Sequence, residues 1–435
     1  MVLLTPSLKK TKEVHFSSSA KLLLELNRLS PKAGDATCLA AAQKLDVLRK
    51  NLPTDPSEAA FEQHIKYWAE IVQVDSSLDS FPSFEINFRW YDAWQAPTAL
   101  PGGPTPVKST SCNLEIAAVL FNAATLALQY GAQCHAQKTV AKYSMAQKYF
   151  LRAAGLYTAV HDRVKGVQDE VSMDMSSSAL EMLKMLSLAH AQRCFFDAAV
   201  AQGKYATIAP QLASATADYY EEVLGMIKDK KTPLGQMLNK VNCFKKWTSD
   251  IMVNMLYYRA TSQQYEAVKL SQDRIGNIGA EILRLRAARE MLTLADTRAK
   301  QQQLPLRQTV ADALATVETA LAAATADNDL IYHVLPDELA RMHGTLAAIS
   351  GKSMVEGKEE DPRGLVTEPT RLFQWLVPAA LHHTAEKVRI ERSLVLDKML
   401  TALQLNVNSA RSCLSTLSPL LDAQRVGIQG GEGRQ

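Results

Sequence analysis

No other part of the chain restricts the possible folds as strongly as Asn113–Gln133, with the sequence NLEIAAVLFNAATLALQYGAQ. Its apolar residues cover almost every face of a helix, so this helix can exist in water only if other helices surround it. A chain of 435 residues, 47% of them hydrophobic, is long enough to bury such a helix in a large core. We therefore predict a mostly α-helical domain with Asn113–Gln133 buried in its middle.

Further helices are predicted from apolar residues that recur with helical period. The predicted helices are Ser18–Leu29, Ala36–Lys50, Ser57–Val74, Ala141–Val164, Cys243–Gln303 with one interruption around Gly276 and Gly279, Leu306–Thr325, Thr370–Leu376 and Leu381–Leu417. Small residues alternate with bulky ones in several of them, which indicates closely stacked helical hairpins of a tetratricopeptide-like kind. Phe84–Trp94 instead alternates and is rich in aromatic residues, so it predicts one strand of a small β-hairpin.

A helical hairpin is predicted between Ser178 and Tyr220. Ser178 and Glu181 form a capping-box pattern for the first helix, and Gly203 breaks the run. Pro210 is compatible only with a first helical turn, so the second helix is expected to begin near Thr207. The hairpin carries more apolar residues than one buried face needs, among them Phe195, Ile208 and Leu212. Sequence alone favours burial of these three, with an exposed apolar surface as the alternative.

Charge and cysteine content narrow the class of protein. A net charge of +3 is too small to indicate nucleic acid as the main partner. The six cysteines lack C-x-x-C spacing, which favours a reducing cytosol over a disulfide framework or a zinc site. The start MVLLTPSLKK does not resemble a signal peptide. The richest apolar run, Ile116–Leu128, contains Asn122 and is shorter than the ~18 residues of a span, so membrane association is expected to be peripheral or through a partner.

Motifs for catalysis are absent from the sequence, so we predict no enzyme, cofactor, metal or small-molecule substrate. His382 and His383 are adjacent and point apart on a helix, and His190 is expected to be a packed helix histidine. One local group of lysines, here called the basic cluster, is either a solvated face or a contact for anionic lipid headgroups. Its members are Lys228, Lys230, Lys231, Lys240, Lys245 and Lys246.

A series of motifs resembles the BRO-domain family (BRO-one type), which is found at the N-terminus of ALIX and related ESCRT accessory proteins. In chain order they are LKKTKEV at Leu8–Val14, LRK at Leu48–Lys50, YW at Tyr67–Trp68, FRWYDAW at Phe88–Trp94, E-x-x-x-V-L-F-N at Glu115–Asn122, KYFLRAAGLY at Lys148–Tyr157, LAHAQRCFF at Leu188–Phe196, ATADYY at Ala215–Tyr220, GAEILRL at Gly279–Leu285 and DNDLIYH at Asp327–His333. The similarity is collinear from about Leu8 to Pro378. Lys387–Leu420 is similar to the first helix of the V-shaped domain that follows in ALIX-type proteins.

The resemblance implies a curved, boomerang-shaped helical domain that binds the C-terminal amphipathic helix of an ESCRT-III subunit. The subunit is of the Snf-seven, or charged multivesicular body protein four, type. The family's apolar contact patch maps onto Phe195, Ile208 and Leu212, which reverses the preference for burial. Lys142 is the charged residue beside this patch, where family members often carry an acidic one as well. Tyr332 matches a family tyrosine near which a phosphotyrosine-dependent contact has been proposed, and loop packing is its alternative role.

The domain organisation expected from this resemblance is a BRO domain over 1–380, an additional helix over 381–424 and a disordered tail over 425–435. The expected function is that of a cytoplasmic, non-enzymatic adaptor that is recruited to endosomes during multivesicular body sorting. The alternative is a BRO-domain scaffold in ambient-pH or kinase signalling.

Overall fold

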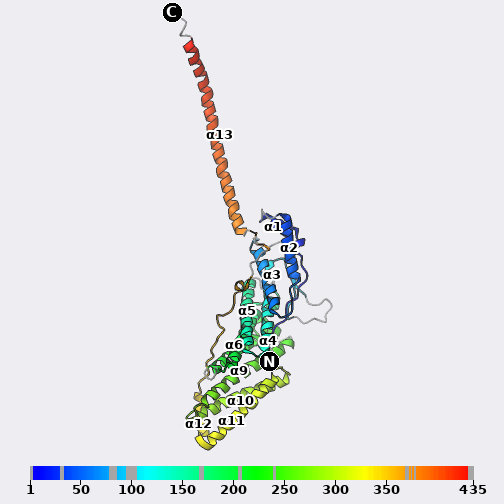
Figure 1. Cartoon of the computed structure of the whole chain (residues 1–435), viewed down its shortest axis with the longest axis vertical. Helices are drawn as coiled ribbons and strands as arrows, with labels where there is room; N and C mark the ends of the chain where they lie inside the picture. The colour runs from blue at the N-terminus through cyan, green and yellow to red at the C-terminus, as the bar shows by residue number, and fades with distance from the viewer. Residues whose placement is uncertain are drawn as a thin grey trace.

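The computed structural model describes residues 3–29, 34–77, 86–94, 105–165, 171–203, 208–238, 242–367, 372–373, 375–376 and 379–429. Within these ranges the chain forms an elongated helical body from which one long C-terminal helix projects (Figure 1). The predicted mostly α-helical fold is confirmed.

The N-terminal elements are η1 (Phe16–Ser18), α1 (Ala20–Arg28), α2 (Asp35–Lys50), α3 (Glu58–Ser77), β1 (Phe88–Trp90), β2 (Val107–Ser109) and α4 (Cys112–Ala136). The middle of the chain contains α5 (Val140–Val164), η3 (Met173–Met175), α6 (Ser177–Ala201), α7 (Ala209–Lys228), α8 (Pro233–Leu238) and α9 (Asn242–Leu270). The last elements are α10 (Ile278–Gln301), α11 (Arg307–Asp327), the π-helical turn η4 (Asn328–Tyr332), α12 (Pro336–Thr345), η5 (Pro362–Leu365) and α13 (Ala379–Gln429).

Helices that follow one another in the sequence also lie side by side. The main contacts run from α3 to α4, α5, α6, α7, α9, α10 and α11 in succession. This order confirms the predicted stacking of helical hairpins. Two buried apolar clusters result, a large one extending from α1 to α7 and a smaller one between α9, α10 and α11.

Helix α4 occupies the centre of the larger cluster, as predicted. It is long and apolar enough to span a membrane by composition, and 89% of its most apolar window is buried inside the protein. The expectation that no run reaches this threshold was therefore wrong. The polar side chain of Asn122 can be buried in this helix because its amide donates to the Lys9 carbonyl oxygen at 3.1 Å and accepts from the Lys9 N–H at 2.7 Å.

The predicted small β-hairpin is present, and its first strand, β1, covers Phe88–Trp90 within the predicted strand Phe84–Trp94. β1 and β2 pair antiparallel with Phe88 opposite Ser109 and Trp90 opposite Val107. Phe84 and Glu85 lie outside the described residues. Thr11, in the extended N-terminal segment, forms a bridge with Trp90. The segment therefore borders the small sheet on the side away from β2.

Two buried carboxylates tie these N-terminal segments to the core. Glu115 of α4 is fully buried and accepts hydrogen bonds from Arg49, Tyr67 and Trp90. Asp174 is fully buried too, and it pairs with the Lys9 ammonium at 2.6 Å. Buried charges of this kind are tolerable only with such partners.

Several predicted boundaries change in the structure. The capping box at Ser178 is wrong, because α6 begins at Ser177 and its N-cap is Ser176, whose side chain makes no capping hydrogen bond. Of the predicted helix Thr370–Leu376, the described residues 372, 373, 375 and 376 are not helical. The predicted disordered tail, residues 425–435, is helical as far as Gln429. Gly427 does not end the helix, because a single glycine weakens a helix by only ~1 kcal/mol. Residues 430–435 lie outside the described part of the chain.

Candidate partner-binding surface

The candidate surface is built by the hairpin of α6 and α7. α6 is buried on nearly every face from Ala179 to Cys194 because α5 and α7 enclose it. Its last turns are only half-buried, and Gly203, with φ of 68°, ends the run in a conformation that glycine adopts freely. Pro210 lies in the first turn of α7, as predicted. The end of α6 and the start of α7 therefore form the exposed corner of an otherwise buried hairpin.

The three predicted patch residues do not share one environment. Phe195 and Ile208 are half-buried and lie against the larger core with part of each side chain at the surface. Leu212 is only 3% exposed, so its predicted place on an exposed strip is wrong. Leu212 follows Ile208 by one turn, and at this point α7 is enclosed by α6 and α9. The exposed apolar surface consists of Phe195 and Ile208, and Leu212 lies in the core.

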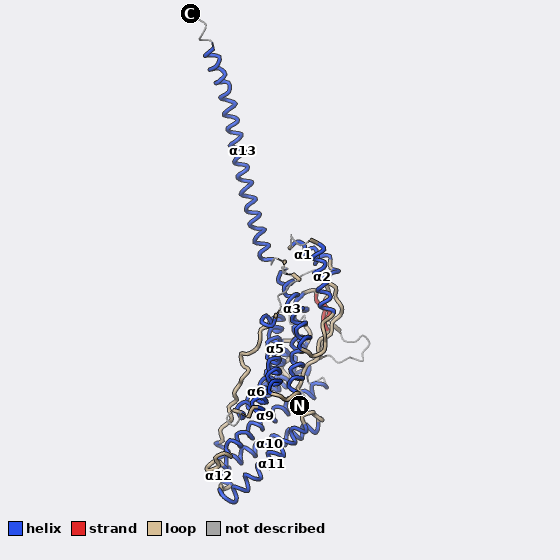
Figure 2. The backbone as a smooth tube through the Cα atoms, viewed as in Figure 1, coloured by secondary structure: helices blue, strands red, loops and turns tan. Residues whose placement is uncertain are grey.

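An extended segment, residues 346–361, crosses this hairpin, and we call it the strap. The buried side chain of Gln192 holds it by accepting the Met354 N–H at 2.8 Å and donating to the Lys352 carbonyl oxygen at 3.0 Å. The Lys352 N–H donates to the Gln211 carbonyl oxygen at 3.0 Å. In Figure 2 the strap is the long tan segment that rises from α12 along the helices toward α5. Nothing in the sequence of this segment shows where it lies.

Two glycines mark where the strap approaches the helices most closely. A Cβ atom on Gly155 of α5 would lie 2.0 Å from the Glu360 carbonyl oxygen. A Cβ atom on Gly351 of the strap would lie 3.0 Å from the backbone of Ala215 in α7. Gly155, within KYFLRAAGLY, is the one sequence signal that could have indicated a backbone passing over α5.

Lys358 of the strap covers part of the surface. Its ammonium lies 5.3 Å from the centroid of the Phe195 ring, within the range of a cation–π contact. Lys358 is exposed and has no carboxylate partner among the described residues. A partner that binds at Phe195 therefore meets this cation over the aromatic ring.

Asp197 places an acidic side chain next to this apolar surface. The Asp197 carboxylate, two positions after Phe195, is 2.7 Å from His135 Nε2 and 3.5 Å from Arg193 Nε. Burial lowers the pKa of His135, although the hydrogen bond that its ring donates to the Asp197 carboxylate raises it. Asp197 was not predicted, because the charged residue expected beside the patch was Lys142, which lies on α5, whereas Asp197 lies on α6.

The other predicted site residues lie elsewhere. Lys142 is half-buried in the first turn of α5, where its N–H donates to the capping Thr139 hydroxyl. Tyr332 ends the π-helical turn η4 and is half-buried against the smaller core, which favours its packing role.

His190 is buried between the Tyr220 hydroxyl and the Leu4 carbonyl oxygen, and burial lowers its pKa to about 3. The prediction of a packed helix histidine is confirmed.

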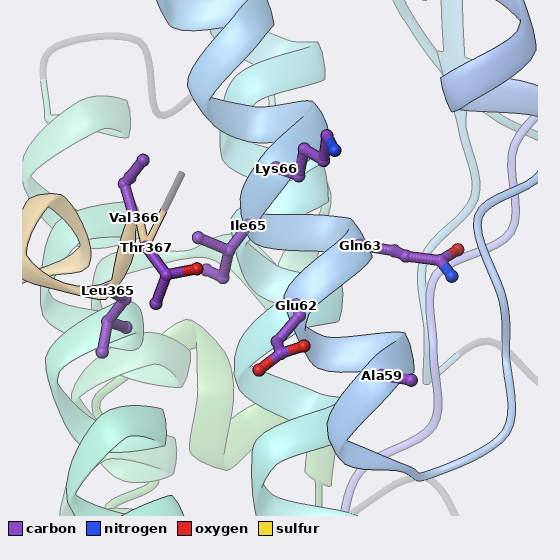
Figure 3. Close-up of a pocket in the computed structure, with 8 residues that line it drawn as sticks. All are labelled: Ala59, Glu62, Gln63, Ile65, Lys66, Leu365, Val366 and Thr367. Atoms are coloured by element: carbon purple, nitrogen blue, oxygen red, sulfur yellow. The ribbon is translucent and has the colours of Figure 1, made fainter. Parts of the chain in front are cut away.

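Pockets of about 220 to 520 Å³ also lie on the body. The strap continues to α3, where Leu365, Val366 and Thr367 face Ile65 and Glu62 across a pocket of about 220 Å³ (Figure 3). No group of three or more His, Cys, Asp or Glu side chains suited to a metal ion occurs in the described residues.

A curved stack of helical hairpins with an apolar corner and a crossing strap defines a helical binding scaffold. The BRO1-like domain family model matches residues 3–396, and the chain belongs to this family. The chain is 28% identical over 336 residues to programmed cell death 6-interacting protein from Rattus norvegicus, covering 75% of this chain and 36% of the relative. It is 27% identical to vacuolar-sorting protein BRO1 from Arabidopsis thaliana, covering 64% of this chain and 32% of the relative. The chain thus spans about a third of the length of these curated relatives.

Solved structures show the same fold. The ALIX BRO1 CHMP4C complex superposes with a TM-score of 0.73 at 25% identity, covering 86% of this chain and 99% of that chain. ALIX in complex with the SIVmac239 PYKEVTEDL late domain superposes with a TM-score of 0.80 at 23% identity, covering 99% of this chain and 61% of that chain.

Proposed function

We propose that this chain is a non-enzymatic adaptor that binds the C-terminal amphipathic helix of an ESCRT-III subunit. The observation that carries the proposal is the half-exposed pair Phe195 and Ile208 at the corner of α6 and α7. An amphipathic helix docks by laying its i, i+3, i+4 and i+7 residues on such an apolar surface. The likeness to a BRO1 structure solved with CHMP4C supports the choice of an ESCRT-III partner.

The proposed contacts divide between apolar and charged residues. Phe195 and Ile208 provide the apolar surface, and Leu212 supports it from the core. Lys358 provides positive charge at the Phe195 ring. Lys142, in the first turn of α5, is a second proposed charged contact for the partner. The partner is of the Snf-seven, or charged multivesicular body protein four, type.

The proposed setting is endosomal sorting, with multivesicular body formation and protein transport as its outcome. The similarity to a relative named a vacuolar-sorting protein supports this setting. The adaptor works in the cytoplasm and reaches the endosomal membrane through its partner. Exposed lysines of the basic cluster, such as Lys230 and Lys231, add a weak and salt-sensitive attraction to anionic lipids.

A binding titration tests the proposal. A fluorescent peptide with the C-terminal helix of an ESCRT-III subunit is titrated with the full chain, and a scrambled peptide of the same composition is the control. We expect a micromolar Kd for the first peptide, corresponding to about −8 kcal/mol, and none for the second. Equal binding of both peptides, or no binding of either at several hundred micromolar, contradicts the proposal.

A further inference from the structure

The N-terminal residues Lys10–Glu13 form an outer strand beside the small sheet, and we call them the edge segment. The Lys12 N–H donates to the Arg89 carbonyl oxygen at 3.2 Å, and the Tyr91 N–H donates to the Lys10 carbonyl oxygen at 2.9 Å. All four residues of the segment are exposed. Among the described residues no further strand pairs with it, so the edge segment is the free edge of the sheet on this side.

Backbone groups of the edge segment point away from the sheet. In an antiparallel pair, successive residues face the neighbouring strand and the opposite side in turn. Lys10 and Lys12 face β1 through the two bonds above, so the N–H and C=O of Thr11 and the N–H of Glu13 face outward. None of these three groups has a hydrogen-bond partner within the described part of the chain. An unpaired edge of this kind can bind an extended peptide as an additional strand.

The edge segment has room beside it for such a peptide. A cleft of about 470 Å³ lies between the segment and α2, within the ~300–1,000 Å³ of typical ligand pockets. Arg49 of α2 fixes the segment by donating to the Lys12 carbonyl oxygen at 3.0 Å and to the Thr11 hydroxyl at 2.8 Å. In Figure 2 the two strands, drawn in red, lie beside α2. The free edge is therefore held in position and opens on a cleft.

The outward face of the sheet is positively charged. Arg89 lies directly opposite Lys108 in the strand register, and its carbonyl oxygen is bound by Lys12 on the other side. Residues opposite one another on neighbouring strands project from the same face, and so do residues two apart on one strand. The face therefore carries Lys10, Lys12, Arg89 and Lys108, while the residues on either side of Arg89 in β1 are buried on the other face.

These four cations have no carboxylate partner among the described residues, and the nearby Glu13 pairs with Lys50 at 3.3 Å instead. Like charges on adjacent strands repel one another, so the negative side chains of an added strand relieve that repulsion. A second copy of this chain brings the same positive face and increases it. Membrane lipids can contact the cations, but they cannot continue the hydrogen bonding of the sheet. An acidic, extended protein segment satisfies both the charges and the backbone groups.

We propose that the edge segment binds an extended, acidic segment of a partner protein, which adds as a strand in the cleft beside α2. The added strand hydrogen-bonds the outward groups of Thr11 and Glu13 and places its acidic side chains next to Lys10 and Lys12. The site is independent of the adaptor function, because it lies on the N-terminal segment and β1, whereas the partner-binding surface lies on α6 and α7.

A fluorescence-anisotropy titration of the full chain tests the proposal. The probe is a labelled peptide of about twelve residues in which glutamate and threonine alternate, so that all its glutamates project from one face. We expect saturable binding, and Lys12→Glu is expected to weaken it by more than about tenfold because it places like charges side by side. Lys398→Glu makes the same change of charge at an exposed position of α13 and is expected to leave the affinity unchanged.

Two modified peptides separate strand addition from charge attraction alone. In one peptide the backbone nitrogen of every glutamate is methylated, and in the other that of every threonine. Because only alternate residues of an added strand face the edge, one of the two peptides is expected to bind more than about tenfold more weakly than the other.

Four results overturn the proposal. Absence of binding of the unmodified peptide at about 500 µM shows that the edge takes no acidic strand. Equal binding of the two methylated peptides assigns the contact to charge alone, and unchanged affinity of Lys12→Glu places the peptide elsewhere. Binding to phosphatidylserine vesicles that Lys12→Glu removes, without binding of the peptide, assigns the face to a membrane. The thermal midpoint is recorded for both variants and is expected to stay unchanged, because Lys12 and Lys398 are exposed.

Discussion

Glu115→Gln is expected to destabilise the body more than any exposed substitution. The Glu115 carboxylate is fully buried and accepts from Arg49 Nε at 2.8 Å, Arg49 Nη2 at 3.2 Å, the Tyr67 hydroxyl at 2.8 Å and Trp90 Nε1 at 2.8 Å. These donors come from α2, α3 and β1, so one side chain of α4 joins three other elements.

Glutamine keeps the shape but reverses part of the chemistry. Its amide nitrogen turns a donor toward the donors of Arg49 or Trp90, and the guanidinium of Arg49 loses its negative partner. Arg49 keeps hydrogen bonds to the Lys12 carbonyl oxygen and the Thr11 hydroxyl, which limits the loss. Removing one partner of a buried ion pair destabilises by ~3–5 kcal/mol.

Circular dichroism melts of both proteins measure the effect. We expect the midpoint to fall by roughly 5–10 °C, since 1 kcal/mol shifts a large domain by ~2 °C or more. Glu290→Gln, at an exposed position of α10, is the matched control and is expected to melt like the wild type. A Glu115→Gln midpoint within about 1 °C of the wild type refutes the reasoning, because the carboxylate would then contribute no net stability.

Three further predictions follow from the strap, the buried histidines and the basic cluster. Gly155→Ala should release the strap at Glu360 and speed its cleavage in limited proteolysis, whereas Gly225→Ala, with open space around its Cβ, should not; equal cleavage of the two contradicts the role of Gly155. Burial lowers the pKa of His64 to about 4 and that of His190 to about 3, below ~6.5 in an unfolded chain. Unfolding should therefore become easier by a few kcal/mol as pH falls from about 6.5 to 4, and a flat urea midpoint over that range speaks against it. Binding to acidic vesicles should weaken as salt rises from about 0.05 to 0.5 M, and salt-insensitive binding in a flotation assay contradicts a surface contact.

The sequence predicts those parts of the fold that depend on local periodicity. Asn113–Gln133 is apolar on every face, so its burial follows from the sequence alone. The α6 and α7 hairpin follows in the same way from Gly203 and Pro210. The family resemblance then places the candidate site on this hairpin through Phe195 and Ile208.

The errors in the site prediction come from contacts between distant segments. Leu212 lies one turn after Ile208, and it is buried because α7 packs between α6 and α9. The strap reaches the hairpin from more than 100 residues away, through Gln192 and Lys352. No periodic pattern records such a path, and so the contact of Lys358 with Phe195 could not be predicted.

The partner-binding surface is tested most directly by Ile208→Asp, with melting temperature and peptide affinity measured on the same sample. Ile208 is half-exposed at the N-cap of α7, where a negative charge is mildly favourable, so the body should melt within a few degrees of the wild type. Leu212→Asp, which buries an unpaired charge one turn later, should melt far earlier.

An aspartate in the apolar interface is expected to remove ~2–4 kcal/mol or more of the ~8 kcal/mol in a micromolar complex. The account predicts an Ile208→Asp protein that melts almost normally and no longer binds the ESCRT-III helix at measurable concentrations. An Ile208→Asp protein that melts normally and binds the peptide as tightly as the wild type would contradict it.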